Sequence, residues 1–390
     1  MMNKSSAKTL GELIKNEMNE NPNFYFFSPD ETTSNKLDAV FDASSRAWSN
    51  LEIKAQDLKE SDGGRIVELL SENTLFAVML GTILAGNKAM MTSYESFFAI
   101  ITSQIIQHLK FLEQSEKVAW REKYPAVNLL STSTCWRQDH NGFSHQSPAL
   151  ISTLLARPGR NVNCFFPVDS ESMKTVFDYM INSENVVNLV TFNKTDEPQY
   201  IDENHAKYQF ENGASIFGFA SDGDTFYLES EQNHFDFVFT AAGDIATRES
   251  LEAMKIIRED MPELKLRFVN ILSLTHEKIG TCGREMSQEN FEKLFTKDAP
   301  IISNFHGYKD TLKNILRNYT NVEIFAHGFE EQGSTTTPLQ MLALNHASRF
   351  DLAIDVVRKM NREDLVNKYQ KTIDENRAHA NEFGVDLIEL

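Results

Sequence analysis

The chain has 390 residues, of which 41% are hydrophobic and 24% are charged. This ordinary globular balance excludes collagen, a coiled coil and wholesale disorder. Lysine and arginine number 38 against 56 aspartate and glutamate residues, so the formal net charge is −18. A field of that sign repels nucleic-acid phosphates and anionic lipid. We therefore expect no nucleic-acid or membrane partner, and an anionic substrate would need a local cluster of donors.

The cysteines and the N-terminal segment bear on the cellular compartment. Cys135, Cys164 and Cys282 are widely spaced and include no CxxC pair. This fits a reduced cytoplasm better than a disulfide framework or a zinc site. The N-terminal segment has no signal-peptide apolar region. The longest apolar stretch, residues 74–86, is too short to span a bilayer, so we expect a cytoplasmic protein.

Short apolar runs alternate with longer helical segments through the first half of the chain. Leu10, Leu13, Ile14 and Met18 recur with helical spacing over residues 8–19. A buried strand is expected at 24–27, and further short apolar runs follow at 76–86, 126–132, 161–169 and 185–193. Strands that alternate with helices predict a parallel sheet covered on both faces.

The second half repeats this pattern after a polar stretch, residues 194–212, which we expect to be a linker. Candidate strands lie at 214–221, 235–244, 265–272 and 299–307, and helices are expected near 245–260, 286–297 and 338–360. We therefore predict two consecutive three-layer α/β domains with mainly parallel sheets, formed by residues 1–200 and 201–390.

The segment SPDETTSNKL places Asp30, Glu31, Ser34 and Lys36 just after a predicted strand. Ligands bind in such loops at the carboxyl ends of parallel strands. A hydroxyl and an ammonium two residues apart near a helix N-terminus suit a phosphate group. The alternative, which the pattern alone favours, is ordinary helix capping by the aspartate, serine and threonine side chains.

A second polar segment, WRQDHNGFSHQ, contains Gln138, His140, Asn141 and His145. Either histidine could move protons near neutral pH. Their five-residue spacing does not suit a helical metal pair, which needs positions i and i+4, so we expect no metal site. A surface loop with incidental histidines is the alternative.

Four further features have both a structural and a functional interpretation. Glu72 could cap a helix or be a half-buried acid. Tyr94 and Phe97 lie one helical turn apart, which usually indicates core packing and less often a platform for a flat ring. Lys194 follows a predicted strand and is either a solvated charge or an anion ligand. The segment 332–338, QGSTTTP, is expected to form a loop and helix N-terminus that could bind an anion or a partner backbone.

Several segments together resemble the phosphoketolases, which are thiamine-diphosphate enzymes related to transketolase. The segments that carry the resemblance are FSPDETTSNKL, LLSEN, TSYESFF, STCWRQDHNGFSHQSP, GDIATRESLEA, FTKDAPIISNFHGY and FEEQGSTTTPLQMLALNHASRFDLA. They occur in order from about residue 8 to about 357 and imply a transketolase-like fold.

The resemblance is to only the second half of such an enzyme, its pyrimidine-binding and C-terminal domains. The first domain of the family carries a GDG…N motif that holds magnesium and the cofactor diphosphate. We therefore expect a split subunit, a truncated gene product or an expressed fragment that is inactive by itself. The expected partners are a second copy of the chain and a separate diphosphate-binding chain, because the family binds its cofactor between subunits.

The resemblance implies a role for each candidate residue. On the pyrimidine side of thiamine diphosphate, Glu72 would contact the ring nitrogen N1′, Phe97 would stack on the ring, and Tyr94 and Asp30 would lie beside it. The remaining candidates would handle the substrate. His140 and His145 would assist proton transfer, and Gln138 and Asn141 would orient the sugar. The phosphate of the sugar would be held by Ser34, Lys36, Asn141 and Lys194.

The activity implied is cleavage of xylulose 5-phosphate or fructose 6-phosphate with phosphate, giving acetyl phosphate and an aldose phosphate. Some segments depart from the family pattern. Lys36 stands where arginine is usual, and the segments 73–90 and 195–206 differ from the expected sequence. These departures are typical of the alternative hypothesis, a non-catalytic phosphoketolase-like protein with a binding or regulatory role.

Overall fold

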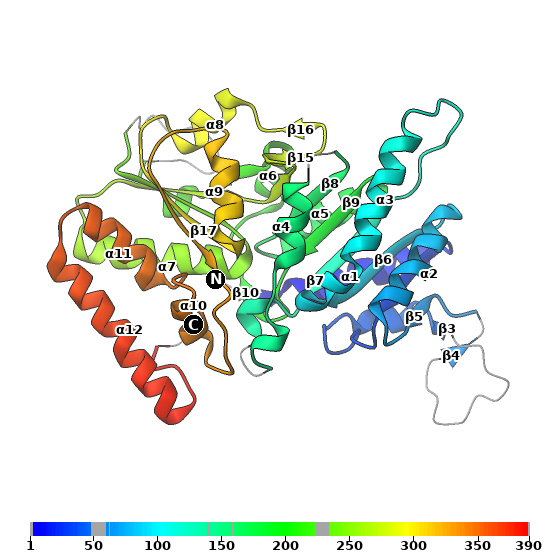
Figure 1. The fold of residues 1–390 in the computed structure, drawn as a ribbon, viewed down its shortest axis with the longest axis horizontal. Coiled ribbons are helices and arrows are strands. Elements are labelled where there is room, and N and C mark those ends of the chain that lie inside the picture. The colour runs from blue at the N-terminus through cyan, green and yellow to red at the C-terminus, as the bar shows by residue number, and fades with distance from the viewer. Residues whose placement is uncertain are drawn as a thin grey trace. The chain divides into compact units, whose positions relative to one another are not determined.

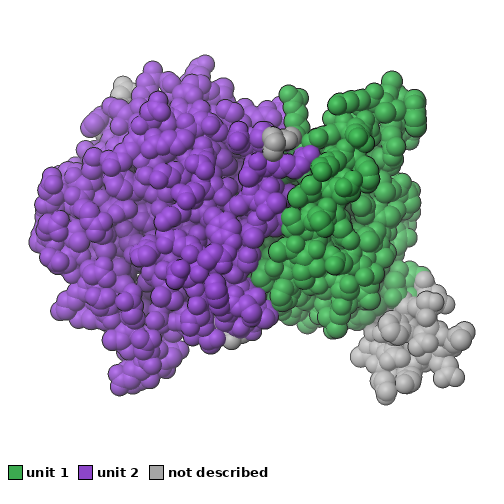
Figure 2. All heavy atoms as spheres, in the orientation of Figure 1, with its two compact units in different colours: residues 1–133, 158–203 green, residues 134–157, 204–390 purple. Residues whose placement is uncertain are grey.

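The computed structural model describes residues 3–47, 60–61, 63–138, 141–157, 160–223 and 234–388. The chain divides into two compact units, which Figure 1 shows as ribbons and Figure 2 in separate colours. Unit 1 comprises residues 1–133 and 158–203, and unit 2 comprises residues 134–157 and 204–390. The segment 134–157, which includes the second polar segment, therefore packs with the C-terminal part of the chain.

Unit 1 contains a parallel sheet. Its spatial order is β8 (Val162–Phe165), β9 (Val187–Thr191), β7 (Val127–Thr132), β6 (Lys88–Tyr94), β2 (Phe24–Ser28), β5 (Ile66–Glu68), β3 (Arg46–Ala47) and β4 (Glu60–Ser61). All neighbouring pairs are parallel. Every residue of β7, β8 and β9 is buried. Burial on both faces is typical of parallel strands, and the buried asparagines of these three strands, Asn128, Asn163 and Asn188, hydrogen-bond to one another.

The helices of unit 1 are α1 (Ser6–Glu20), α2 (Glu72–Leu84), α3 (Thr102–Ser115) and α5 (Ser170–Asn182), with short 3₁₀ turns η1 (Asp38–Asp42) and η2 (Glu95–Ile101). The apolar face of α1, formed by Leu10, Ile14 and Met18, is buried as its spacing predicts, and the helix packs against α5. Ser71 caps α2 by accepting a hydrogen bond from the Thr74 amide.

Unit 2 has its own mixed sheet in the order β11 (Ala214–Ile216), β13 (Leu266–Ile271), β12 (Phe237–Ala242), β17 (Ile301–Tyr308) and β18 (Ile324–Phe329). The last four strands are parallel, and β11 runs antiparallel to β13. A small antiparallel meander follows β13 and consists of β14 (Ser273–Thr275), β15 (Lys278–Thr281) and β16 (Arg284–Glu285). These sheets confirm the predicted α/β class with mainly parallel strands.

The helices of unit 2 are α4 (Ala149–Ala156), α6 (Glu203–Asn212), α7 (Asp244–Asp260), α8 (Gln288–Phe295), α9 (Lys309–Arg317), α10 (Pro338–Leu344), α11 (Arg349–Lys359) and α12 (Glu363–Phe383), with 3₁₀ turns η3 (Cys135–Arg137), η4 (Phe143–His145) and η5 (Gly218–Ala220). The long closing helix α12 lies along α11 (Figure 1). Ser348 and Asp351 form a capping box at the start of α11.

The segment 194–212, expected to be a linker, contains the boundary between the two units, but most of it is ordered secondary structure. Residues Asp196–Pro198 form β10, which pairs antiparallel with β1 (Asn3–Ser5). Helix α6 then buries His205 and Gln209 as well as Ala206 and Phe210. The polar side chains find partners inside, since His205 Nε2 is 2.8 Å from Ser215 Oγ and Gln209 Nε2 donates to Asn270 Oδ1 at 2.7 Å.

Candidate functional site

The carboxyl ends of the central strands in unit 1 meet at one edge of the sheet. Strands β2, β6, β7 and β9 are parallel neighbours. The residues at or just after their ends are Glu31, Tyr94, Ser133 and Lys194. Loops at this edge are the usual ligand sites of parallel sheets. Most of the predicted cofactor and phosphate ligands therefore belong to one region of unit 1.

The loop after β2 is a tight turn followed by the 3₁₀ turn η1, and no α-helix begins there. Ser28 Oγ accepts from the Glu31 amide at 3.0 Å, and the Asn35 amide donates to the Glu31 carbonyl at 2.9 Å. Asp30 and Lys36 have left-handed backbone angles, with φ of 63° and 59°. The capping alternative for this segment is therefore not realised, and the loop holds its side chains at the edge of the sheet.

Glu31 is the most perturbed carboxyl of this region. Its Oε2 accepts a hydrogen bond of 3.0 Å from the Tyr94 amide. Burial, and to a lesser extent the charge of Glu72, raise the pKa of Glu31 to about 8 against the opposite effects of the Tyr94 amide, the Asn35 side chain and Lys194. Glu31 is therefore mostly protonated at neutral pH.

Lys194 lies beside Glu31 in the same region. Its Nζ donates to Ser133 Oγ at 2.9 Å, and Ser133 Oγ donates to Asn35 Oδ1 at 3.2 Å. The Lys194 ammonium also lies 5.2 Å from the centroid of the Tyr94 ring. Burial lowers the pKa of Lys194, nearby Lys36 lowers it further, and Glu31 raises it. Lys36 therefore lies within electrostatic reach of Lys194.

The aromatic pair and Glu72 complete this part of the site. Tyr94 and Phe97 are stacked, with ring centroids 5.9 Å apart and an interplanar angle of 21°. Tyr94 OH lies 3.2 Å from Ser34 Oγ. Glu72 is the first residue of α2, is half-buried, and is near enough to Glu31 to influence its ionisation. The structure therefore brings the predicted residues Ser34, Tyr94, Phe97 and Glu72 into one region, and Asp30 is exposed on its loop.

The second polar segment is built into unit 2, where it contacts the QGSTTTP loop. Asn141 Nδ2 donates to Gln138 Oε1 at 2.8 Å. Gln146 Nε2 donates to the Gln138 carbonyl at 3.2 Å and to the Ser334 carbonyl at 3.3 Å. Two segments almost two hundred residues apart thus form one structure.

His145 lies in η4, half-buried, with Nδ1 2.8 Å from Ser144 Oγ. Gly142 approaches the QGSTTTP loop so closely that a Cβ on it would lie 2.7 Å from Thr335 Oγ1. The predicted His140 lies outside the described residues. The assignment of catalytic and substrate roles to His145, Gln138 and Asn141 stays a prediction.

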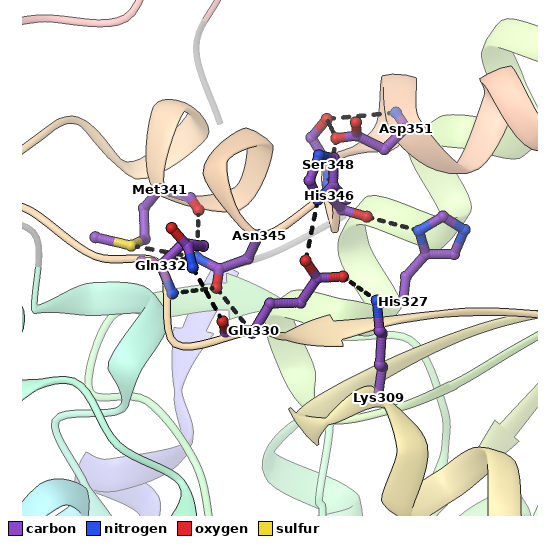
Figure 3. Close-up of polar contacts among 9 residues, drawn as sticks. All are labelled: Lys309, His327, Glu330, Gln332, Met341, Asn345, His346, Ser348 and Asp351. Atoms are coloured by element: carbon purple, nitrogen blue, oxygen red, sulfur yellow. Dashed lines mark hydrogen bonds and ion pairs between the residues drawn. The ribbon is translucent and has the colours of Figure 1, made fainter.

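A network of polar contacts fixes the start of the QGSTTTP loop (Figure 3). The buried Asn345 accepts from the amides of Glu330 and Gln332 at 2.9 and 3.2 Å and donates to the carbonyls of Gln332 and Met341 at 2.7 and 2.9 Å. Glu330 pairs with Lys309 and with His346. These contacts hold the loop in place from β18 and from the end of α10.

Sequence reasoning gave no role to Glu31 or Ser133, both of which contact predicted ligands. Glu31 stands next to Asp30 in the segment SPDETTSNKL, but nothing in that pattern distinguishes a buried carboxyl from an exposed one. Ser133 follows β7 and links Lys194 to Asn35. Its role depends on contacts 61 and 98 residues away in the sequence.

Two family models together match nearly the whole chain, including the segments that contain these candidate residues. The family model for D-xylulose 5-phosphate/D-fructose 6-phosphate phosphoketolase matches residues 7–183, and the model for its C-terminal domain matches residues 194–390. The chain belongs to the phosphoketolase family. This membership confirms the resemblance of the sequence segments.

Individual phosphoketolase relatives extend well beyond the matched region. A probable phosphoketolase of Thermosynechococcus vestitus is 34% identical over 395 residues, which are 99% of this chain and 48% of the relative. One from Rhodopseudomonas palustris strain TIE-1 is 35% identical over 388 residues, 98% of this chain and 48% of the relative. The chain therefore spans about half the length of the phosphoketolases it matches.

Solved structures of transketolases share the fold of this phosphoketolase chain. A Pichia stipitis transketolase in complex with sedoheptulose 7-phosphate has a TM-score of 0.66 at 15% identity, over 95% of this chain and 47% of that one. A split-gene transketolase, described as an inactive β4 tetramer, has a TM-score of 0.60 at 15% identity, over 91% of this chain and 97% of that one. The predicted transketolase-like fold is thereby confirmed. Among the described residues, the helices are too short or too polar to cross a bilayer.

Proposed function

We propose that this chain is the pyrimidine-binding and C-terminal half of a thiamine-diphosphate-dependent phosphoketolase. The complete enzyme cleaves xylulose 5-phosphate or fructose 6-phosphate with phosphate to give acetyl phosphate and an aldose phosphate. The observation that carries the proposal is the convergence of Ser34 and Lys194 on Tyr94, beside Glu31 and Glu72, at the carboxyl edge of a parallel sheet. Family membership supports the same reaction.

The residues of unit 1 fit the pyrimidine ring of the cofactor. A flat heteroaromatic ring with a basic nitrogen needs an aromatic face and a nearby carboxyl group. Phe97 and Tyr94 are half-buried rather than enclosed, and Glu72 is a half-buried carboxyl at a helix start. In the proposal, Phe97 stacks on the ring and Glu72 holds the proton at N1′. When bound, the cofactor supplies the electron sink for carbon–carbon cleavage.

The other predicted residues take part in the proposal through binding and proton transfer. Ser34, Lys36 and Lys194 bind the phosphate of the sugar. Lys36 carries a single flexible ammonium group and cannot make the planar two-point contact of a guanidinium. Ser34 and Lys194 therefore contribute more to phosphate binding than they would beside an arginine. As the family resemblance implies, Asn141 and Gln138 are assigned to orienting the sugar hydroxyls, and His145 together with His140 to moving protons.

The proposal includes a complementary diphosphate-binding domain, with magnesium, and a homodimer in the cytoplasm. The support is that the matched relatives are about twice as long as this chain. A split-gene transketolase of this fold also exists. Cys135, Cys164 and Cys282 form no disulfide bond, which suits a reducing compartment.

A second candidate function is a non-catalytic binding or regulatory role. It is favoured by the departures from the family sequence at 73–90 and 195–206. On α2, within the first of these segments, Val78 and Leu84 are 45% and 47% exposed, and exposed apolar side chains of this kind suit contact with a partner. In this alternative the chain keeps the sugar-phosphate site and uses α2 to hold a partner.

The test is complementation. The purified chain is incubated with fructose 6-phosphate, phosphate, thiamine diphosphate and magnesium, and acetyl phosphate is measured as its hydroxamate. We expect no product from the chain alone and turnover after co-expression with the diphosphate-binding domain of a relative. Product from the chain alone would refute the need for a partner domain. A stable complex that binds sugar phosphate without turnover would favour the non-catalytic alternative.

A further inference from the structure

The phosphate ligands of the proposed function share their site with a carboxyl group, Glu31. Its position is fixed from two sides, because Ser28 Oγ accepts from its amide at 3.0 Å and its Oε2 accepts from the Tyr94 amide at 3.0 Å. The Ser28 contact anchors the backbone of Glu31, and the Tyr94 contact holds its carboxyl group at the edge of the sheet. A change of charge on the carboxyl group can therefore accompany anion binding without a change of its position.

The charged groups that face Glu31 come from every element around it. Lys194, which follows β9, and Glu72, which begins α2, both act on Glu31, whereas Lys36 of the same loop acts on Lys194. An ionised Glu31 repels a phosphate dianion and offsets part of the attraction of the ammonium groups of Lys36 and Lys194. A neutral Glu31 removes that repulsion, so the site attracts the anion more strongly.

We propose that binding of a phosphate monoester dianion at Ser34, Lys36 and Lys194 is coupled to the uptake of one proton by Glu31. The inference rests on the proposed function, because it takes the phosphate site from there. It adds that the site favours the dianion only when Glu31, a residue with no role in the proposed function, is protonated. Glu31 acts on binding indirectly, because its neutral form does not repel the phosphate.

The direction of the pH dependence follows from the environment of Glu31. Burial raises the pKa of Glu31 to about 8 in the free site, and two added negative charges raise it further. At pH 7 the carboxyl group of Glu31 is already mostly protonated, so few additional protons are taken up when the anion binds. Above pH 8 it is mostly ionised and must take a proton from solution, so affinity falls about tenfold between pH 7 and pH 9.

Isothermal titration calorimetry of the full chain with fructose 6-phosphate tests this coupling. The sugar phosphate is already a dianion at these pH values, since the second pKa of a phosphate monoester is about 6. Titrations at pH 7 and pH 9 give the change in affinity. Repeating the pH 8.5 titration in two buffers of different ionisation enthalpy counts the protons, and we expect between one half and one proton taken up.

The variant Glu31→Gln keeps an oxygen for the Tyr94 amide but cannot ionise, and we expect it to bind with nearly the same affinity at pH 7 and pH 9 without proton uptake. Glu12→Gln, at an exposed position on α1, is the matched control and should behave as the unaltered chain does. The proton count on the unaltered chain does not depend on the variant folding. Proton uptake that persists in Glu31→Gln would assign the coupling to Lys194 and overturn the inference.

The remaining outcomes separate this inference from the proposed function. Binding of fructose 6-phosphate with no proton uptake at pH 8.5 would overturn the coupling and leave the proposed substrate site standing. Absence of binding at both pH 7 and pH 9 would remove the phosphate site itself, and with it the substrate assignment from which the inference starts.

Discussion

Gly333 lies so close to Gln146 that a Cβ on the glycine would be 2.1 Å from Oε1 of the glutamine and 2.3 Å from Cδ2 of Phe143. These three residues join the two most characteristic segments of the chain within unit 2. A glycine is therefore required at position 333 by the close approach of a neighbouring loop. The contact fixes the QGSTTTP loop relative to Gln138 and Asn141.

Substitution of Gly333 by alanine should destabilise unit 2 by about 1–3 kcal/mol, because Gln146 and Phe143 must both move. Urea unfolding followed by tryptophan fluorescence, which reports on the buried Trp136, measures the loss. The matched control is Gly81→Ala in α2, where a Cβ meets nothing within 4 Å. That change should be neutral or stabilise by up to about 1 kcal/mol. Equal effects of the two changes would contradict the steric argument.

The buried ion pair between Arg349 and Glu249 should be among the most sensitive contacts of unit 2. Arg349 Nη2 and Nε donate to the Glu249 carboxylate at 2.6 and 3.0 Å, and the Arg349 amide donates to it at 2.8 Å. Arg349→Met leaves the carboxylate buried without its cation and should cost about 3–5 kcal/mol. Thermal and urea unfolding measure the change in free energy.

The control for this pair is Lys293→Met on α8. Its partner Glu289 lies 3.1 Å away, and the side chains are 44% and 78% exposed. Loss of such a surface pair should cost less than about 1 kcal/mol. A similar cost for Arg349→Met would show that water reaches Glu249 and that the pair is not buried in solution.

His108 on α3 should make unit 1 sensitive to acid. Burial lowers the pKa of His108 to about 4, whereas in the unfolded chain it is about 6.5. Between these values the unfolded state binds a proton that the folded state does not, so stability falls as pH drops from 6.5 towards 4. The loss reaches about 3 kcal/mol at most. Urea midpoints at pH 7, 5.5 and 4.5 measure it.

His108→Leu should remove this part of the pH dependence. Any deficit in the free energy of unfolding of the variant relative to the unaltered chain should therefore shrink or change sign as the pH is lowered. Leu112→Met, on the same helix and also buried, controls for altered packing without a titrating group. Parallel curves for His108→Leu and the unaltered chain between pH 7 and pH 4.5 would show that the imidazole is solvated.

Glu72→Gln should abolish most of the turnover of a complemented enzyme. A positioned acid or base contributes about 10²–10⁴ to a rate, so we expect kcat to fall by at least a hundredfold while the complex still assembles. Steady-state kinetics measures kcat, and size-exclusion chromatography shows whether the complex still assembles. The exposed Glu12→Gln should leave the rate unchanged. An unaltered kcat in Glu72→Gln would remove this residue from the proposed site.

Much of the fold was predictable from local pattern. The helical spacing of Leu10, Ile14 and Met18 predicts α1, and the apolar run Phe24–Phe27 predicts β2. Such patterns are informative because one face of a helix, or both faces of a parallel strand, must be buried. Helix α6 was missed because part of its buried face consists of His205 and Gln209, whose hydrogen-bond partners lie in distant strands.

The sequence alone determined the family, the α/β class and a set of candidate ligands, because short motifs and apolar periodicity are local properties of the chain. Tertiary structure decided which carboxyl is half-buried beside Tyr94 at the sheet edge, that Ser133 links Lys194 to Asn35, and that residues 134–157 pack with unit 2. The physical reason is that burial and proximity depend on which strands become neighbours. An ionisation such as that of Glu31 is set by groups that are far apart in the sequence.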